Sequence, residues 1–181
     1  MTGSTIFISG AYGTGKSTLC SALSMRLDIP TFSASDLISA INGEQYGLNK
    51  AVTNKENNQV LLTKCMWELN QKHKRIILAG HFCIFNSNNG VEVLPETVYH
   101  ALNISRIILL ETNVQTILEH LNYRDGKDYP ACSVAALLIK EREQGEKIAK
   151  RLNCPLDIYR MTFTEKDTNC IASLLTGENL S

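Results

Sequence analysis

The chain has 181 residues, of which 44% are hydrophobic and 7% aromatic, and its 18 basic and 18 acidic side chains leave no formal net charge. This length is enough for one domain with a full hydrophobic core. The balanced charge gives no sign of a nucleic-acid-binding protein. No apolar run approaches the roughly 20 residues that cross a bilayer. Since the first apolar segment leads straight into a glycine-rich turn, we expect no signal peptide and a cytoplasmic location.

Six cysteines are spread along the chain, and no two of them form a CxxC pair. No cluster of histidines accompanies them, so the spacing argues against a zinc site. Buried free thiols in a reducing compartment are the favoured interpretation.

The N-terminal part of the chain alternates between strand and helix patterns. Residues 4–9 (STIFIS) form a short run of β-branched and aromatic residues, which is typical of a buried strand. Leucines at helical spacing then predict a helix over 16–27. A strand over 30–32 follows, and Ser33 with Asp36 resembles a capping box that begins a short helix.

The rest of the chain continues this alternation after a polar stretch, 42–52, that we interpret as a loop. Thr53 and Glu56 have capping-box spacing and predict the next helix. The remaining predicted elements are a strand over 75–80, an irregular connection over 81–94, a short helix at Pro95, a strand over 104–110, a helix from Asn113 through Leu121, a polar segment over 122–131, a long helix over 133–152, a strand over 156–159 and a final helix capped by Thr162 and Glu165.

Strands and helices therefore alternate about five times. This order predicts an α/β three-layer sandwich, in which a central parallel sheet of about five strands has helices on both faces. No repeat, linker or change of composition divides the chain, so we expect a single domain over 1–181.

Residues 10–17 (GAYGTGKS) match the phosphate-binding pattern GxxxxGK[ST] between a predicted strand and a predicted helix. Glycines let backbone N–H groups approach phosphates closely, and the N-terminus of the helix adds partial positive charge. Lys16 would neutralise the β- and γ-phosphates, and the Ser17 hydroxyl would ligate Mg²⁺. The predicted cofactors are therefore ATP and Mg²⁺, although the motif itself does not separate ATP from GTP. The predicted nucleotide-binding residues are Gly10, Tyr12, Gly13, Thr14, Gly15, Lys16, Ser17 and Thr18.

Four segments give the chain a resemblance to the adenylate-kinase-like nucleoside monophosphate kinases, above all the archaeal-type and small nuclear-type adenylate kinases. These segments are residues 6–27 with the following Asp36-Leu37, residues 77–85, residues 109–112, and the Arg124-Asp125 region with the helix that carries Arg142. The resemblance implies a P-loop kinase that transfers the γ-phosphoryl group of Mg·ATP to a nucleoside monophosphate, with AMP the first candidate.

The same resemblance implies which residues act in catalysis. Arginine forks suit phosphate oxygens, so Arg124, in a lid-like segment over 122–131, and Arg142 are candidates together with Lys16. Lys127 beside Arg124 is a further candidate. The predicted partners are ATP and a small-molecule phosphate acceptor, with no membrane and no clear nucleic-acid partner; the oligomeric state is left open.

One position departs from the family pattern. Ala79 stands where these kinases tend to place an Asp that holds the water shell of Mg²⁺. Asp36 or Glu111, each near the end of a predicted strand, could replace it, and we favour Asp36 as a catalytic residue and metal ligand. A helix cap is the alternative role of Asp36. His81 could contact phosphate or acceptor, or could be a hydrogen-bonded structural histidine.

Two other functions fit the same sequence. One is a P-loop kinase with a non-nucleotide acceptor, as in shikimate or gluconate kinases. The other is a nucleotide-dependent regulatory module that hydrolyses ATP slowly or not at all, and Ala79 keeps this possibility open.

Overall fold

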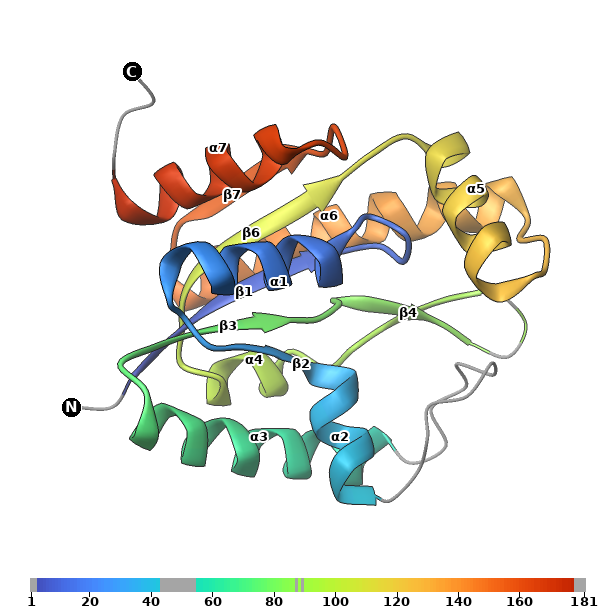
Figure 1. Cartoon of the computed structure of the whole chain (residues 1–181). Helices are drawn as coiled ribbons and strands as arrows, with labels where there is room; N and C mark the ends of the chain where they lie inside the picture. Colours follow the sequence, from blue (N-terminus) through green and yellow to red (C-terminus); the bar gives the residue numbers. More distant parts are fainter. Residues whose placement is uncertain (1–2, 43–54, 87, 89, 178–181) are drawn as a thin grey trace.

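The computed structural model describes residues 3–42, 55–86, 88 and 90–177. Five parallel strands form a central sheet in the order β2-β3-β1-β6-β7, and helices cover both faces (Figure 1). The predicted α/β sandwich with about five parallel strands is thereby confirmed. The predicted loop, from residue 43 on, and the predicted cap by Thr53 and Glu56 lie outside the residues whose side chains are described.

The strands are β1 (Ser4–Gly10), β2 (Thr31–Ser33), β3 (Arg75–Ala79), β4 (Cys83–Phe85), β5 (Val91–Val93), β6 (Ile104–Glu111) and β7 (Leu156–Arg160). The helices are α1 (Lys16–Leu27), α2 (Ala34–Asn42), α3 (Lys55–Lys72), α4 (Thr97–Ala101), α5 (Val114–Asp125), α6 (Ala131–Leu152) and α7 (Glu165–Thr176).

Two apolar layers enclose the sheet. Helices α1 and α7 pack against each other over one face, above a cluster that includes Ile8 and Leu110. The other face lies under α3, α4, α5 and α6, where Phe7 and Phe82 belong to a larger cluster. β1 is buried from Thr5 on and lies at the centre of the sheet. The P-loop therefore follows a buried strand at the centre of the sheet.

The segment over 81–94 is not the irregular connection that the sequence predicts. It contains the antiparallel hairpin of β4 and β5, in which Ile84 pairs with Glu92. Between these strands, the Asn86 side chain accepts hydrogen bonds from the N–H groups of Asn88 (3.0 Å) and Gly90 (2.9 Å). The hairpin brings Phe85 of β4 against Tyr12 of the P-loop.

Two predicted helix starts have different outcomes. Asn113 caps α5 as predicted, because its side chain accepts a hydrogen bond of 2.8 Å from the N–H of Thr116. The predicted cap of α7 by Thr162 and Glu165 is wrong. Thr164 is the N-cap residue, and Thr162 instead donates hydrogen bonds to Asp167.

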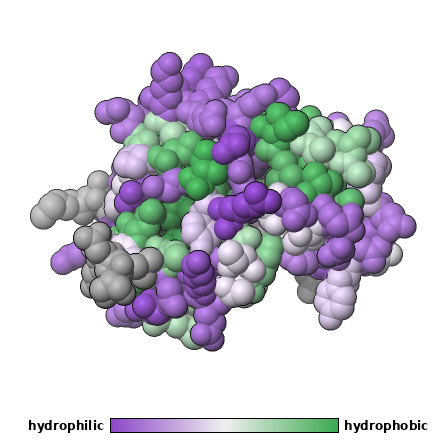
Figure 2. All heavy atoms as spheres, turned by 90° about the horizontal axis from the view of Figure 1, so that it is seen from above, coloured by the Kyte–Doolittle hydropathy of each residue, from purple (hydrophilic) through white to green (hydrophobic). Residues whose placement is uncertain are grey.

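The surface carries apolar side chains as well as charged ones. Figure 2 shows, on the face seen from above, apolar patches interspersed with hydrophilic side chains. Among the helices that the structure describes, none is long and apolar enough to cross a membrane.

Candidate functional site

The P-loop joins β1 to α1 at the carboxyl end of the central strand. Gly13 (φ 80°) and Gly15 (φ 85°) both have left-handed backbones, and Gly15 is also the N-cap residue of α1. Side chains with a Cβ are strained in this conformation, which glycine adopts readily. A turn of this kind can aim successive N–H groups at one anion in front of the helix N-terminus. The loop therefore has the shape that a polyphosphate requires.

Lys16 lies folded against the loop that it follows. Only 9% of the residue is exposed, and its Nζ atom donates hydrogen bonds to the carbonyl oxygens of Gly10 (2.6 Å) and Ala11 (2.8 Å). Ser17 and Thr18, in contrast, are exposed on the first turn of α1. The Lys16 ammonium group beside the glycine turn is suited to the phosphates of Mg·ATP, and the exposed Ser17 hydroxyl is suited to its metal ion.

Asp36 lies in the first turn of α2, at the same edge of the sheet. Its N–H lies 3.4 Å from the Ser33 hydroxyl oxygen, the contact expected of a weak capping box, and its side chain is exposed. Ser33 pairs with Ala79, and Ala79 pairs with Ile8 of β1. Asp36 is therefore placed two strands from the P-loop, while Ala79 is buried. Among the described residues no group of three His, Cys, Asp or Glu side chains could hold a metal by itself.

Arg124 lies in the last turn of α5, because this helix runs four residues beyond its predicted end. Its guanidinium donates two hydrogen bonds to Asp125, of 2.7 and 2.9 Å, and Asp125 also accepts one of 2.8 Å from the Tyr129 hydroxyl. The Nζ atom of Lys127 lies 4.8 Å from the centre of the Tyr129 ring. Half of the predicted lid-like segment is thus helix, and its cations are held by neighbours in the same segment.

Arg142 on α6 reaches the end of β6. Its Nε atom lies 3.2 Å from Glu111 and 3.7 Å from Glu146, and nearly half of its side chain is exposed. Because Gly10 pairs with Leu110, Glu111 ends its strand beside the start of the P-loop. Glu111 is therefore an ion-pair partner of a candidate phosphate-binding arginine, a role that the sequence did not suggest.

Aromatic rings extend from the P-loop to the lid-like segment. The Tyr12 ring lies 5.5 Å from that of Phe85 with 27° between their planes, and Phe85 lies 5.7 Å from Tyr129 at 22°. We call these three residues the aromatic row. His81 lies against its inner end, 4.5 Å from Tyr12. Burial raises the pKa of Tyr129 to about 12, and burial likewise raises that of Tyr12, so both phenols are neutral at pH 7.

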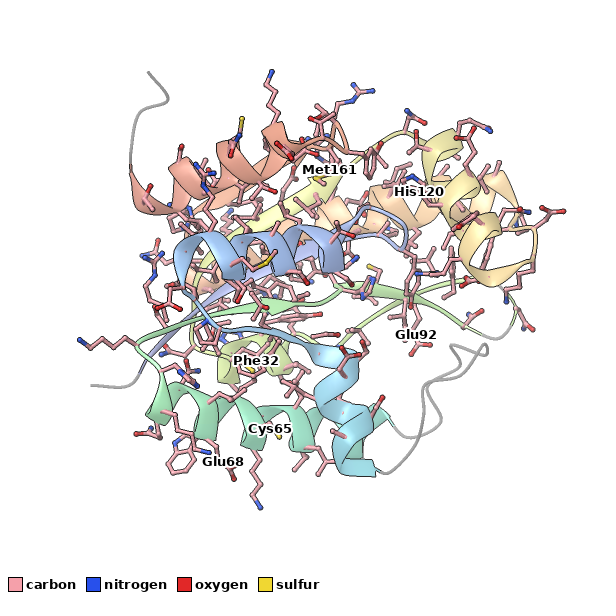
Figure 3. All side chains as sticks on the ribbon, in the orientation of Figure 1. Phe32, Cys65, Glu68, Glu92, His120 and Met161 are labelled. Atoms are coloured by element: carbon pink, nitrogen blue, oxygen red, sulfur yellow. The ribbon has the colours of Figure 1, made fainter. Side chains whose placement is uncertain are left out.

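A second aromatic pair lies on the other side of the P-loop. Figure 3 shows His120 and Met161 above the loop and Glu92 of β5 below it, in this view. The His120 ring contacts that of Phe163 edge to face at 4.8 Å. A Cβ atom on Gly15 would lie 3.3 Å from Phe163 and 3.4 Å from Met161. The loop after β7 therefore lies beside the P-loop, which we also call the phosphate cradle.

Asp167 fixes this loop. Phe163 has a left-handed backbone (φ 59°), and the buried Asp167 carboxylate accepts its N–H at 2.7 Å together with the N–H and hydroxyl of Thr162 and the hydroxyl of Tyr159. Burial acts to raise the pKa of Asp167, but these hydrogen bonds outweigh burial and lower it. A left-handed non-glycine residue persists only where its surroundings hold it, which is the case here.

Glu141 is the buried charged group that sequence reasoning missed. Only 1% of this α6 residue is exposed, and its carboxyl group accepts hydrogen bonds from the N–H groups of Gly10 (3.1 Å), Phe82 (3.0 Å) and Cys83 (2.7 Å). Burial raises its pKa to about 7, against the opposing effects of these bonds and of Lys16. The local sequence KEREQGEK resembles a solvated helix face, so no signal in it marks Glu141 as buried.

Three solved structures that share this fold are two shikimate kinases and a gluconokinase. A shikimate kinase from Acinetobacter baumannii, in complex with shikimate, is 15% identical and superposes with a TM-score of 0.65 over 99% of this chain and 96% of that one. A shikimate kinase from Bacteroides thetaiotaomicron is 14% identical, with a TM-score of 0.63 over 96% of each chain. A gluconokinase from Sinorhizobium meliloti 1021 is 12% identical, with a TM-score of 0.53 over 98% of this chain and 97% of that one. These likenesses are of fold.

No curated protein matches the sequence. A protein-family model described as an AAA domain matches residues 9–137, from the end of β1 into α6. This stretch contains the P-loop, the hairpin, Arg124 and the loop that follows it. The adenylate-kinase-like subtype that the sequence suggested is not what these comparisons identify. The chain has a P-loop kinase fold and belongs to the AAA-domain family that this model describes.

Proposed function

We propose that this protein is a phosphotransferase that moves the γ-phosphoryl group of Mg·ATP to a nucleoside monophosphate, with AMP the first candidate. The observation that supports the choice of acceptor is the aromatic row, which begins in the P-loop itself: Tyr12 and Tyr129 are half-buried at its two ends, and Phe85 is buried between them. Aromatic faces stack on nucleobases, and such stacking contributes about 1–3 kcal/mol per base.

On the donor side, the residues of the P-loop bind and orient the triphosphate. Lys16 would leave the carbonyl oxygens of Gly10 and Ala11 and donate to the β- and γ-phosphates. Ser17 and Asp36 are the side chains that would hold Mg²⁺, which when bound neutralises charge on the transferred phosphoryl group. His120 and Phe163 offer an aromatic surface for the base of the donor.

On the acceptor side, arginines would bind the phosphoryl group during its transfer and the phosphate of the acceptor. Arg124 and Arg142 are held by Asp125 and Glu111, respectively, and a phosphate dianion competes with a carboxylate for the same fork geometry. We propose that residues 122–131 act as a lid, in which release of Arg124 from Asp125 accompanies closure over the two substrates. Closure would also exclude water and so disfavour hydrolysis of ATP.

A second candidate is a small-molecule kinase with a non-nucleotide acceptor. It is supported by the fold that this chain shares with shikimate kinases and a gluconokinase. The aromatic row favours the nucleotide, because hydroxylated acids offer no flat ring to stack.

The test is a coupled assay of ADP formation with Mg·ATP and a panel of acceptors: the ribonucleoside and deoxyribonucleoside monophosphates, shikimate, gluconate and water alone. We expect transfer to one or more nucleoside monophosphates at a rate about 10–100-fold below that of a typical adenylate kinase, because Ala79 leaves the metal without a supporting carboxylate. Transfer only to a hydroxylated acid would favour the second candidate.

Lys16→Ala purified in parallel is the control, since it removes the cation required for turnover and exposes any contaminating kinase. A wild-type protein that binds ATP tightly but phosphorylates no member of the panel is not a phosphotransferase for these acceptors. That result would instead support a nucleotide-dependent regulatory module.

A further inference from the structure

We propose that Glu141 is a positioning residue: its buried carboxyl group holds the first amide of the P-loop and the turn after β3 in one fixed geometry. Its effect on rate rests on the proposed function, whereas its effect on the two backbone segments does not. The role is distinct from that of the neighbouring Arg142, which we expect to touch phosphate.

The contacts of Glu141 join segments that are remote in sequence. Gly10, at the end of β1, lies 131 residues away, and Phe82 and Cys83, at the start of the hairpin, lie 59 and 58 residues away. All three residues are buried, so their N–H groups need partners within the protein. One carboxyl group supplies these partners and therefore ties the segments to each other and to α6.

Gly10 is held on both sides of its backbone. Its N–H donates to Glu141, and its carbonyl oxygen accepts a hydrogen bond of 2.6 Å from Lys16. When phosphate draws Lys16 away from that oxygen, the bond to Glu141 remains as a side-chain anchor of the loop. Glu141 is thus placed to keep the cradle in position at the moment when the lysine moves.

The surface of α6 is shaped to receive the turn after β3. Gly145 lies one helical turn beyond Glu141, and a Cβ atom there would meet the Phe82 ring at 3.3 Å. The missing side chain lets the turn approach closely enough for the Phe82 and Cys83 amides to reach the carboxyl group. Glu141 and Gly145 together therefore form the part of the α6 surface on which this turn packs.

Each anchored segment carries a side chain of the candidate site. Tyr12 follows Gly10 by two residues, and His81 precedes Phe82; their rings lie 4.5 Å apart. Arg142 is the residue after Glu141 and reaches Glu111. A shift at Glu141 would consequently displace the donor side, the acceptor side and an arginine together. Displacements of about 1 Å can cost on the order of 100-fold in rate.

The test compares the full-length wild type with Glu141→Gln, in which an NH₂ group replaces one acceptor oxygen and faces the backbone donors. Amide hydrogen exchange is followed in peptides that cover residues 8–14 and 80–85. We expect exchange to speed up at least tenfold in both segments, and kcat to fall about 100-fold with a smaller change in the KM for the acceptor. A merely structural role would lower the melting temperature while leaving kcat of the folded protein unchanged.

The matched control is Glu143→Gln on the same helix, whose side chain is 52% exposed and pairs with Lys140. It should leave exchange and kinetics as in wild type. Folded Glu141→Gln protein with wild-type exchange in either segment, or with wild-type kcat and KM, overturns the proposal.

If Glu141→Gln does not fold, Glu141→Asp decides, because it keeps the carboxyl group but shortens its reach. Faster exchange in both segments supports the proposal, and a change confined to one segment overturns it. The exchange measurement needs no turnover. A wild type without kinase activity would therefore refute the proposed function, while the exchange result would still decide the anchoring role of Glu141.

Discussion

The Nδ1 atom of His120 lies 2.7 Å from the carbonyl oxygen of Gly13, so α5 is hydrogen-bonded directly to the phosphate loop. The same imidazole ring packs against Phe163, which borders Gly15. Three segments, the P-loop, α5 and the loop after β7, thus meet on the side of the phosphate cradle that lies away from the aromatic row. This junction is where we expect the base of the donor nucleotide.

Phe163→Ala should weaken ATP binding by roughly 10-fold or more, because a base stacked on an aromatic ring gains about 1–3 kcal/mol. Phe163 is 41% exposed, so loss of its ring should change the melting temperature little. Calorimetric titration with ATP and with inorganic tripolyphosphate separates the base from the phosphates. Equal losses for both ligands would contradict a base contact.

Lys16→Ala should weaken ATP binding by about 100-fold, since a hydrogen bond to a charged group contributes roughly 1.5–3 kcal/mol. In the structure Lys16 also bonds two carbonyl oxygens of the loop, so the fold should lose some stability as well. We expect a drop in melting temperature of about 2–8 °C, with native circular dichroism. ATP affinity equal to that of wild type would remove the P-loop assignment.

Asp36→Asn should lose phosphoryl transfer far more than nucleotide binding. A ligand of Mg²⁺ matters most as charge develops in the transition state, and we expect kcat to fall about 10–100-fold with at most a threefold change in ATP affinity. The contact between the Asp36 N–H and Ser33 involves the backbone and should survive the substitution. Unchanged kcat would leave Asp36 with the capping role alone.

Ionisation of Glu141 should make stability depend on pH. Its pKa is raised from 4.5 to about 7 in the folded protein, so between these values the folded state holds more protons than the unfolded chain. The contribution of Glu141 is therefore most favourable below about pH 4.5 and is lost as the pH rises through about 7. Urea unfolding should show the stability of wild type falling by roughly 3 kcal/mol relative to Glu141→Gln across this window. Parallel pH curves for the two proteins would show that Glu141 does not titrate there.

The lid proposal predicts slower amide exchange over residues 122–131 when a bisubstrate analogue is bound. The effect should concentrate after Asp125, since α5 already protects the first residues of this segment. Equal exchange in both states would exclude a closing lid.

The fold was predictable because the central strands of the main sheet are compact, mostly apolar runs. Residues 4–9 and 104–110 consist of such runs and lie at the centre of the sheet, where both faces are buried. The P-loop could be located to the residue, since its glycines and lysine have fixed spacing. Local pattern and tertiary packing agree at these positions.

The hairpin and the burial of Glu141 could not be predicted from the sequence, for a physical reason. Strands β4 and β5 have three residues each, too few for an alternating pattern to emerge. Glu141 is buried by contacts with residues 58 to 131 positions away, and its helical neighbours Lys140, Arg142 and Glu143 are solvated. Only the assembled fold distinguishes it from them.

The central position of β1 has a consequence for the order in which the site can form during synthesis. β1 is synthesised before both of its partners, since β3 follows it by about 70 residues and β6 by about 100 residues. The hydrogen-bond acceptor of the Gly10 amide, the Glu141 carboxyl group, is synthesised later still, 131 residues downstream. Such distant pairings close slowly, because loop entropy must be lost before they form. A nascent chain that ends before α6 should therefore be unable to capture nucleotide, so ATP can stabilise this fold only after most of the chain has been translated.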